Sequence, residues 1–180
     1  LGFRLAASGF EVDAVDVSTE AIELARERAQ RLEVGGLRFT VQDAENLEGF
    51  EDGVFDAVFS LSCLRYLRDP SKAMGEGYRV AKPGGRFVVD FPNKSSPWFS
   101  LVKPLFGIKL HIHDNRFSGQ EVADFMVDAG FTDVRTTKLL FTPRKLPGPL
   151  LPVFKMIDRV CERIPGAKEL AGIVMCVGTK

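Results

Sequence analysis

Short apolar runs alternate with stretches of helical periodicity along most of this chain. The β-rich apolar runs predict six strands, at residues 10–18, 35–43, 54–62, 86–91, 132–142 and 171–180. The helical patterns lie mainly between them, at residues 1–9, 18–32, 70–81 and 118–131. This alternation predicts an α/β fold with a parallel sheet covered by helices on both faces, and the order of the last elements predicts an antiparallel edge.

Local end signals support the predicted helices. Ser18 is a good N-cap, and an apolar stripe follows it at Ile22, Ala25, Ala29 and Leu32. Ser118 and Glu121 match a capping box at the start of a later helix, and Gly130 is placed to end that helix. The segment "KPGG", residues 82–85, predicts a turn between a helix and the next strand.

Two segments interrupt the regular alternation. Residues 92–117 contain prolines, the only Trp and several aromatic residues without steady periodicity, so we interpret them as a lid or insertion. Residues 142–165 combine a proline-rich connection with an amphipathic pattern and predict a C-terminal covering segment. The length of 180 residues fits one domain, and we expect residues 1–180 to form it.

Composition narrows the class of function. The formal net charge is zero, which does not suggest a nucleic-acid binder. Lys and Arg are concentrated in residues 103–163, where a solvated face, an anionic substrate and peripheral membrane contact all stay open. The three widely spaced cysteines indicate neither a disulfide framework nor a zinc site, so we expect a cytoplasmic protein and a metal-independent reaction.

Two carboxylates follow neighbouring predicted strands. In a doubly wound sheet, ligands bind at the carboxyl ends of the strands, where Asp16 and Asp43 both lie. A carboxylate offers acceptors without donors, so Asp16 could accept hydrogen bonds from both ribose hydroxyls of a nucleotide, and Asp43 could accept from an adenine amine. Each residue alone would more often be a helix cap or a loop residue. Together they favour an adenosine site.

Several blocks in order carry a family resemblance. They are "EVDAVDVSTEAIELARERA", "FTVQDAENL", "GVFDAVFSLSCLRYLRDP", "YRVAKPGGRFVV" and "FMVDAGF". The series resembles class I S-adenosylmethionine-dependent methyltransferases, especially the small-molecule group that includes ubiquinone and menaquinone biosynthesis enzymes. The blocks are loose individually, and their order and spacing are specific. The resemblance implies a Rossmann-like doubly wound, mostly parallel sheet with S-adenosyl-L-methionine as the cofactor.

The resemblance also implies roles for individual residues. Asp16 would bind the ribose hydroxyls and Val17 would pack on the adenine. Asp43 would meet the adenine amine with Ala44 beside it, and Ser60 would lie by the methionine part through its backbone. In the family a first strand and a glycine-rich loop precede the helix matched by residues 1–9. We therefore expect an N-terminally truncated fragment that lacks both, and its activity by itself is left open.

Methyl transfer from a sulfonium depends mainly on alignment, and a base is needed only if the nucleophile must lose a proton. The candidate bases are His111, His113 and Tyr66, although His113 could instead order its loop and Tyr66 could simply pack. The candidates for binding a substrate are Arg65, Tyr66, Trp98, Phe99 and Phe106. The lid residues Trp98, Phe99 and Phe106 could instead fill the core beneath the lid.

The leading hypothesis is an enzyme of the EC 2.1.1 class that methylates a small, apolar, aromatic or lipid-like metabolite. A non-catalytic Rossmann-like binding protein is an alternative, because no residue identifies itself as the base. An NAD-dependent dehydrogenase is a second, less favoured alternative. It is considered because Asp16 would bind a dinucleotide ribose equally well. The acceptor, the atom methylated and the oligomeric state stay open.

Overall fold

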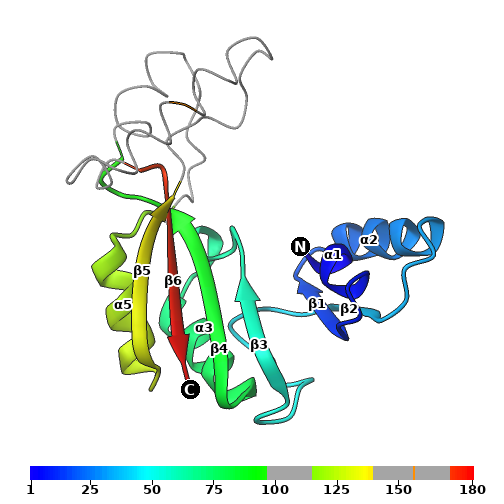
Figure 1. The fold of residues 1–180 in the computed structure, drawn as a ribbon, viewed down its shortest axis with the longest axis horizontal. Coiled ribbons are helices and arrows are strands. Elements are labelled where there is room, and N and C mark those ends of the chain that lie inside the picture. The colour runs from blue at the N-terminus through cyan, green and yellow to red at the C-terminus, as the bar shows by residue number, and fades with distance from the viewer. Residues whose placement is uncertain (97–114, 140–155, 157–170) are drawn as a thin grey trace. The chain divides into compact units, whose positions relative to one another are not determined.

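The structure is a computed structural model that describes residues 1–96, 115–139, 156 and 171–180 (Figure 1). The chain separates into two compact units, Leu1–Phe50 and Glu51–Lys180. The sequence-based prediction of one domain over residues 1–180 stays a prediction. No helix among the described residues is long and apolar enough to cross a membrane.

The first unit is a two-stranded parallel sheet with two helices. Its elements are α1 (Gly2–Ala6), β1 (Val12–Asp16), α2 (Thr19–Arg31) and β2 (Leu37–Val41). The strands pair in register from Val12 opposite Leu37 to Asp16 opposite Val41. Parallel strands cannot be joined by a tight hairpin, and α2 provides the crossover between them. The carboxyl ends of β1 and β2 therefore lie at the same edge.

Helix α2 begins where the sequence predicts. The Ser18 hydroxyl accepts a hydrogen bond from the Ala21 amide at 3.1 Å, which satisfies one of the free amides of the first turn. Ile22 is buried, and Ala25 and Ala29 are partly buried. Leu32 is 51% exposed, so the predicted apolar stripe is wrong at its last position. Leu32 is the residue after the last turn of α2, where the chain already leaves the helix.

The second unit is a four-stranded mixed sheet. Its strand order is β3-β4-β6-β5, with β3 parallel to β4 and the other two pairs antiparallel. The antiparallel edge predicted from the sequence is confirmed. The elements are β3 (Phe55–Ser60), the 3-10 turn η1 (Leu64–Tyr66), α3 (Pro70–Val80), β4 (Ala81–Pro92), α5 (Gly119–Asp128), β5 (Thr132–Leu139) and β6 (Ile173–Thr179).

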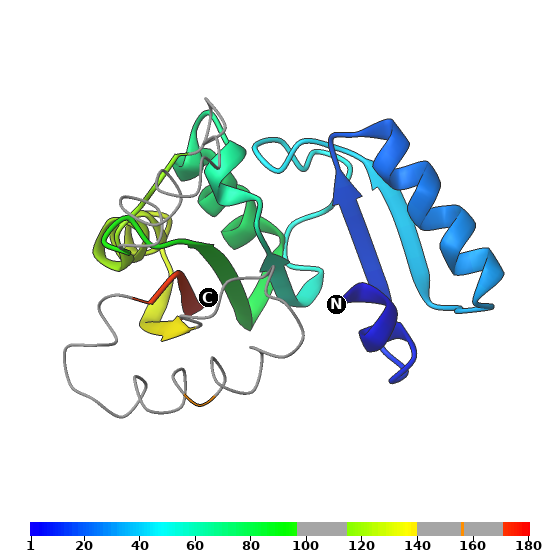
Figure 2. The same cartoon turned by 90° about the horizontal axis from the view of Figure 1, so that it is seen from above.

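The core of this unit lies between the sheet and its helices. Helices α3 and α5 lie together on one side of the strands (Figure 2). Phe87, Val89 and Phe91 alternate along β4 and are almost completely buried, as are Val174 and Cys176 on β6. Successive side chains of a strand point to opposite faces, so the residues between them lie on the other face of the sheet. That second set is partly exposed, and it includes Val88, Asp90 and Met175.

The "KPGG" segment corrects one predicted boundary. Strand β4 begins at Ala81, directly after α3, and residues 82–85 lie within it rather than before it. The pairing of β3 with β4 shifts register between Phe55 and Ala57, and Gly84 has φ +77°. A positive φ suits glycine because it has no Cβ. The segment is therefore an irregularity inside the strand, tied to the C-terminal residue by the Gly84 amide and the Lys180 carbonyl at 2.8 Å.

The buried Asn93 and its neighbour Lys94 form hydrogen bonds with described residues that follow segments 97–114 and 157–170. Asn93 follows β4, and its Nδ2 donates to the Ala171 carbonyl at 2.8 Å. Its backbone amide donates to the Gly172 carbonyl at 3.1 Å, and the Lys94 amide donates to the Phe117 carbonyl at 3.0 Å. The residues that precede 97–114 thus contact those that follow both 97–114 and 157–170. Most of the predicted lid, and residues 142–165 apart from Met156, lie outside the described residues.

Candidate functional site

The two predicted carboxylates lie at the ends of paired strands. Asp16 is the last residue of β1, and Asp43 follows β2 by two residues. The pairing places Asp16 opposite Val41, and the Gln42 amide donates to the Asp16 carbonyl at 3.0 Å. Both aspartates are exposed. The structure therefore brings Asp16 and Asp43 to one edge of the sheet, as the sequence predicts.

Each of these carboxylates uses one oxygen to shape its own loop. Asp16 Oδ1 accepts from the Ser18 amide at 2.9 Å, and Asp43 Oδ1 accepts from the Glu45 amide at 2.9 Å. The Asn46 amide also donates to the Asp43 carbonyl at 3.0 Å, which closes the turn. Neither Oδ2 oxygen accepts a hydrogen bond from the residues described. Each aspartate thus has a structural role that leaves one acceptor free for a ligand.

The residues next to the aspartates differ in exposure. Val17 is 66% exposed, so its apolar side chain is accessible to a ligand, whereas Ala44 is partly buried. Near Asp16, the Ser18 hydroxyl donates to Glu20 at 2.8 Å. The backbone amide of Glu20 and then this hydroxyl lower the pKa of the Glu20 carboxyl. The edge therefore combines exposed acceptors with an exposed apolar side chain.

The remaining described candidates belong to the second unit. Ser60 is the last residue of β3, and a short loop joins it to η1. Tyr66 is 53% exposed, and the Arg65 guanidinium lies 4.5 Å from the centroid of the Tyr66 ring. This contact is a cation–π interaction that holds the two side chains against each other. Ser60, Arg65 and Tyr66 are therefore neighbours in the chain near the carboxyl end of β3.

The turn that carries Tyr66 is also held from the end of the predicted lid. The Asn115 amide donates to the Arg65 carbonyl at 3.0 Å, and Asn115 Nδ2 donates to the Leu67 carbonyl at 2.9 Å. These bonds place the residue that follows segment 97–114 directly against η1. The predicted site residues of that segment lie outside the described residues, namely Trp98, Phe99, Phe106, His111 and His113.

Sequence reasoning missed three polar residues that organise these loops. Asn93 and Asn115, which lie on either side of segment 97–114, donate to the carbonyls of Ala171 and Leu67. Asp90 accepts a hydrogen bond from the Ser62 amide. Asp90 could have been found by the rule that selected Asp16, because it is an acidic residue near the carboxyl end of a predicted strand. The two asparagines had no comparable signal. Among the described residues, no group of three or more His, Cys, Asp or Glu could hold a metal ion.

Each of the two units has polar groups at the carboxyl ends of its parallel strands, as is typical of α/β proteins. Residues 3–89 match the family described as "Methyltransferase domain". A demethylmenaquinone methyltransferase of Leptospira interrogans is 33% identical over 114 residues, or 61% of this chain and 46% of that protein. The Thermus thermophilus protein of the same name is 43% identical over 99 residues, or 53% of this chain and 43% of that protein.

Solved structures support the same assignment of fold. A methyltransferase of Thermotoga maritima, described as a possible histamine N-methyltransferase, has a TM-score of 0.69 at 22% identity and covers 98% of this chain and 76% of that one. Residues 3–89 therefore resemble a methyltransferase domain, and the chain shares the fold of solved methyltransferases, in agreement with the resemblance seen in the sequence. It spans less than half the length of the two curated relatives.

Proposed function

We propose that the protein transfers a methyl group from S-adenosyl-L-methionine to a small, apolar, aromatic or lipid-like metabolite. The observation that carries this proposal is the pair of exposed carboxylates, Asp16 and Asp43, at the ends of two paired parallel strands. Each carboxylate keeps one oxygen available as an acceptor. The spacing of one strand suits a ligand with donors at both ends, such as the ribose and the amine of adenosine.

The residues present fit the adenosine part of the cofactor. The free Oδ2 of Asp16 would accept from the ribose hydroxyls, and Val17 would cover the adenine ring. The free Oδ2 of Asp43 would accept from the adenine amine, with Ala44 beside the ring. The exposure of Val17 supports this assignment, because a bound base would remove its apolar surface from water.

The cofactor supplies a methyl group on a sulfonium that is already a good leaving group. The chain's own task is then to align the acceptor with that methyl group and to exclude water. Ser60 would contribute its backbone at the end of β3. Where the acceptor must lose a proton, Tyr66, His111 and His113 are the candidate bases, and the exposed Tyr66 phenol is the one that the structure describes.

Two observations support an apolar acceptor. The two curated relatives described above are named demethylmenaquinone methyltransferases. In addition, Leu61 and Tyr66 are 40% and 53% exposed next to the end of β3, and Arg65 supports the Tyr66 ring. Small-molecule sites are mostly apolar with a few polar anchors. Trp98, Phe99 and Phe106 stay candidates for binding the acceptor on the evidence of the sequence alone.

Calorimetric binding of S-adenosylhomocysteine to the full-length protein tests the proposal. We expect Asp16→Ala to weaken binding at least tenfold, about 1.4 kcal/mol. Glu11→Ala is the matched control, because Glu11 is an exposed carboxylate at the opposite end of β1. Equal dissociation constants for wild type and Asp16→Ala would remove Asp16 from the site.

The same measurement separates the alternatives. Binding of NAD in place of S-adenosylhomocysteine would favour a dehydrogenase, which could use Asp16 in the same way. Binding of S-adenosylhomocysteine without turnover of any aromatic or lipid-like acceptor would favour a non-catalytic binding protein. Failure of the full-length protein to bind S-adenosylhomocysteine would refute the methyltransferase proposal.

A further inference from the structure

A hydrogen bond connects the loop after β3 to the neighbouring strand. Asp90, near the carboxyl end of β4, accepts a hydrogen bond through Oδ1 from the backbone amide of Ser62. Ser62 lies two residues beyond Ser60, the last residue of β3. The hydrogen bond therefore links β4 to the residues that follow β3. It joins positions 28 residues apart in the sequence.

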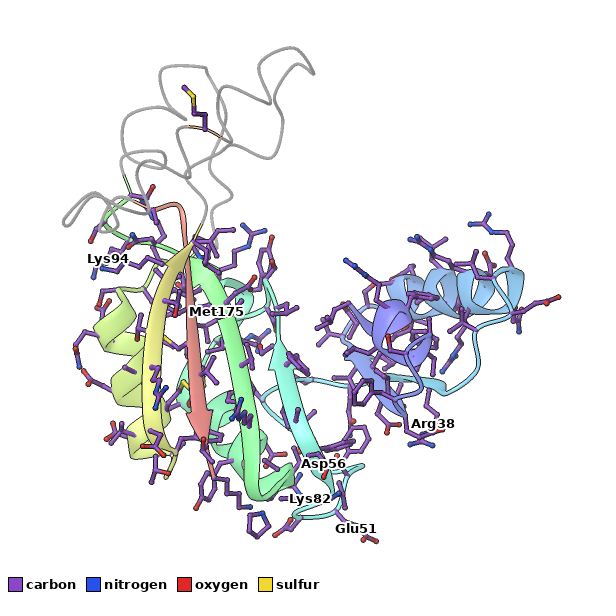
Figure 3. The ribbon with its side chains drawn as sticks, viewed as in Figure 1. Arg38, Glu51, Asp56, Lys82, Lys94 and Met175 are labelled. Atoms are coloured by element: carbon purple, nitrogen blue, oxygen red, sulfur yellow. The ribbon has the colours of Figure 1, made fainter. Side chains whose placement is uncertain are left out.

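The position of Asp90 on its strand explains how it reaches this loop. Val89 and Phe91 on either side are buried beneath the helices, so the Asp90 side chain lies on the opposite face of the sheet. Asp90 pairs with Met175 of β6, a residue labelled in Figure 3, and Ser60 pairs with Val89. This pairing places Ser62, two residues after the end of β3, close to Asp90.

The loop has a backbone conformation that needs support. Ser62 has φ +58°, in the left-handed region that a serine side chain rarely adopts. A bond from an amide to a carboxylate is stronger than one between neutral groups, and a carboxylate offers acceptors only. The next anchor is Leu64, which is fully buried at the start of η1. The residues 61–63 are therefore held by β3 on one side, by Leu64 on the other, and by Asp90 between them.

We propose that Asp90 is a positioning residue for cofactor binding, acting through the backbone of residues 60–63. This inference rests on the proposed function, in which the backbone at Ser60 meets the methionine part of S-adenosylmethionine. Without this acceptor, Ser62 would lose the hydrogen bond that offsets its unfavourable conformation and would relax to a negative φ. The relaxation would turn the peptide planes next to Ser60 and Leu61 away from the ligand.

Two substitutions at Asp90 test the proposal in the full-length protein. Asp90→Ala removes the acceptor, whereas Asp90→Asn keeps an amide oxygen that can accept the same bond. We expect Asp90→Ala to raise the dissociation constant of S-adenosylhomocysteine about tenfold, in line with the loss of one charge-assisted bond. Asp90→Asn should stay within about threefold of wild type. In turnover assays the KM for the cofactor should rise while the KM for the acceptor stays constant.

A matched control and a second readout separate positioning from loss of stability. Asp56→Ala removes an exposed carboxylate from β3 that pairs with Lys82 at 2.8 Å, far from the carboxyl end of the strand (Figure 3). It should leave cofactor binding unchanged. Hydrogen exchange should show a protected Ser62 amide in wild type and in Asp90→Asn, and rapid exchange of that amide in Asp90→Ala with the amides of β4 still protected.

The outcomes distinguish this inference from the proposed function. Wild-type protein that does not bind S-adenosylhomocysteine would overturn both. Wild-type binding together with unchanged binding in Asp90→Ala would overturn the inference alone. A Ser62 amide that exchanges equally fast in wild type and Asp90→Ala, or a loss of affinity in Asp90→Asn as large as in Asp90→Ala, would also overturn it.

Discussion

Two glycines on one helix allow a sharp test of the packing beneath β4. A Cβ built at Gly77 of α3 would lie 3.0 Å from Cζ and 3.2 Å from Cε1 and Cε2 of the Phe87 ring. The Phe87 ring has little freedom to move away, because it stacks on Phe131 with 5.3 Å between the ring centroids. Gly75, two residues earlier on α3, has no heavy atom within 4 Å of its built Cβ.

The two substitutions should therefore differ in sign. Alanine in place of glycine inside a helix stabilises the folded protein by up to about 1 kcal/mol, and Gly75→Ala should gain this amount. Gly77→Ala would gain the same helix term, but overpacking against Phe87 costs about 1–3 kcal/mol. The net result for Gly77→Ala should be a destabilisation of up to about 2 kcal/mol, so the two variants should differ by roughly 1–3 kcal/mol.

Urea unfolding of the full-length protein and the two variants measures this difference. Midpoints monitored by circular dichroism should move up for Gly75→Ala and down for Gly77→Ala with similar slopes. Adding Phe87→Leu to Gly77→Ala should recover part of the loss by relieving the contact. A Gly77→Ala variant as stable as Gly75→Ala would refute the reasoning, because it would show that the Phe87 ring can yield.

Two further predictions concern the polar groups around the lid segment. Asn93→Ala would remove the side-chain donor to the buried Ala171 carbonyl. The free energy of unfolding, measured in urea, should fall by about 1–3 kcal/mol. A fall of less than about 0.5 kcal/mol would contradict a stabilising role for this hydrogen bond. The Ser118 amide, followed by Lys94, lowers the pKa of Glu121 to about 2. The stabilisation from this carboxylate should be complete above the unfolded pKa of about 4.5 and disappear as the pH falls toward 2. The difference in urea midpoint between wild type and Glu121→Gln should therefore shrink from pH 7 to pH 3, and a constant difference would contradict the assignment.

Local patterns predicted the elements because their causes are local. The alternation of apolar runs and helical stripes located the strands and helices, and the Ser118–Glu121 capping box forms as expected. The predictions were wrong at positions whose structure depends on contacts with residues distant in the sequence. Leu32 continued the helical stripe in sequence but lies beyond the packed part of α2. The glycines of residues 82–85 lie inside β4, between positions that pair with β3, and they are hydrogen-bonded to Lys180.

The same division applies to the candidate site. The placement of Asp16 and Asp43 at one edge could be predicted from the sequence, because parallel strands joined by a crossover helix align their carboxyl ends. Only the tertiary structure revealed that Asp90 holds the Ser62 amide and that Asn93 contacts Ala171, residues 28 and 78 positions apart. Such pairs depend on the register between strands, which brings distant residues together without leaving a periodic pattern in the sequence.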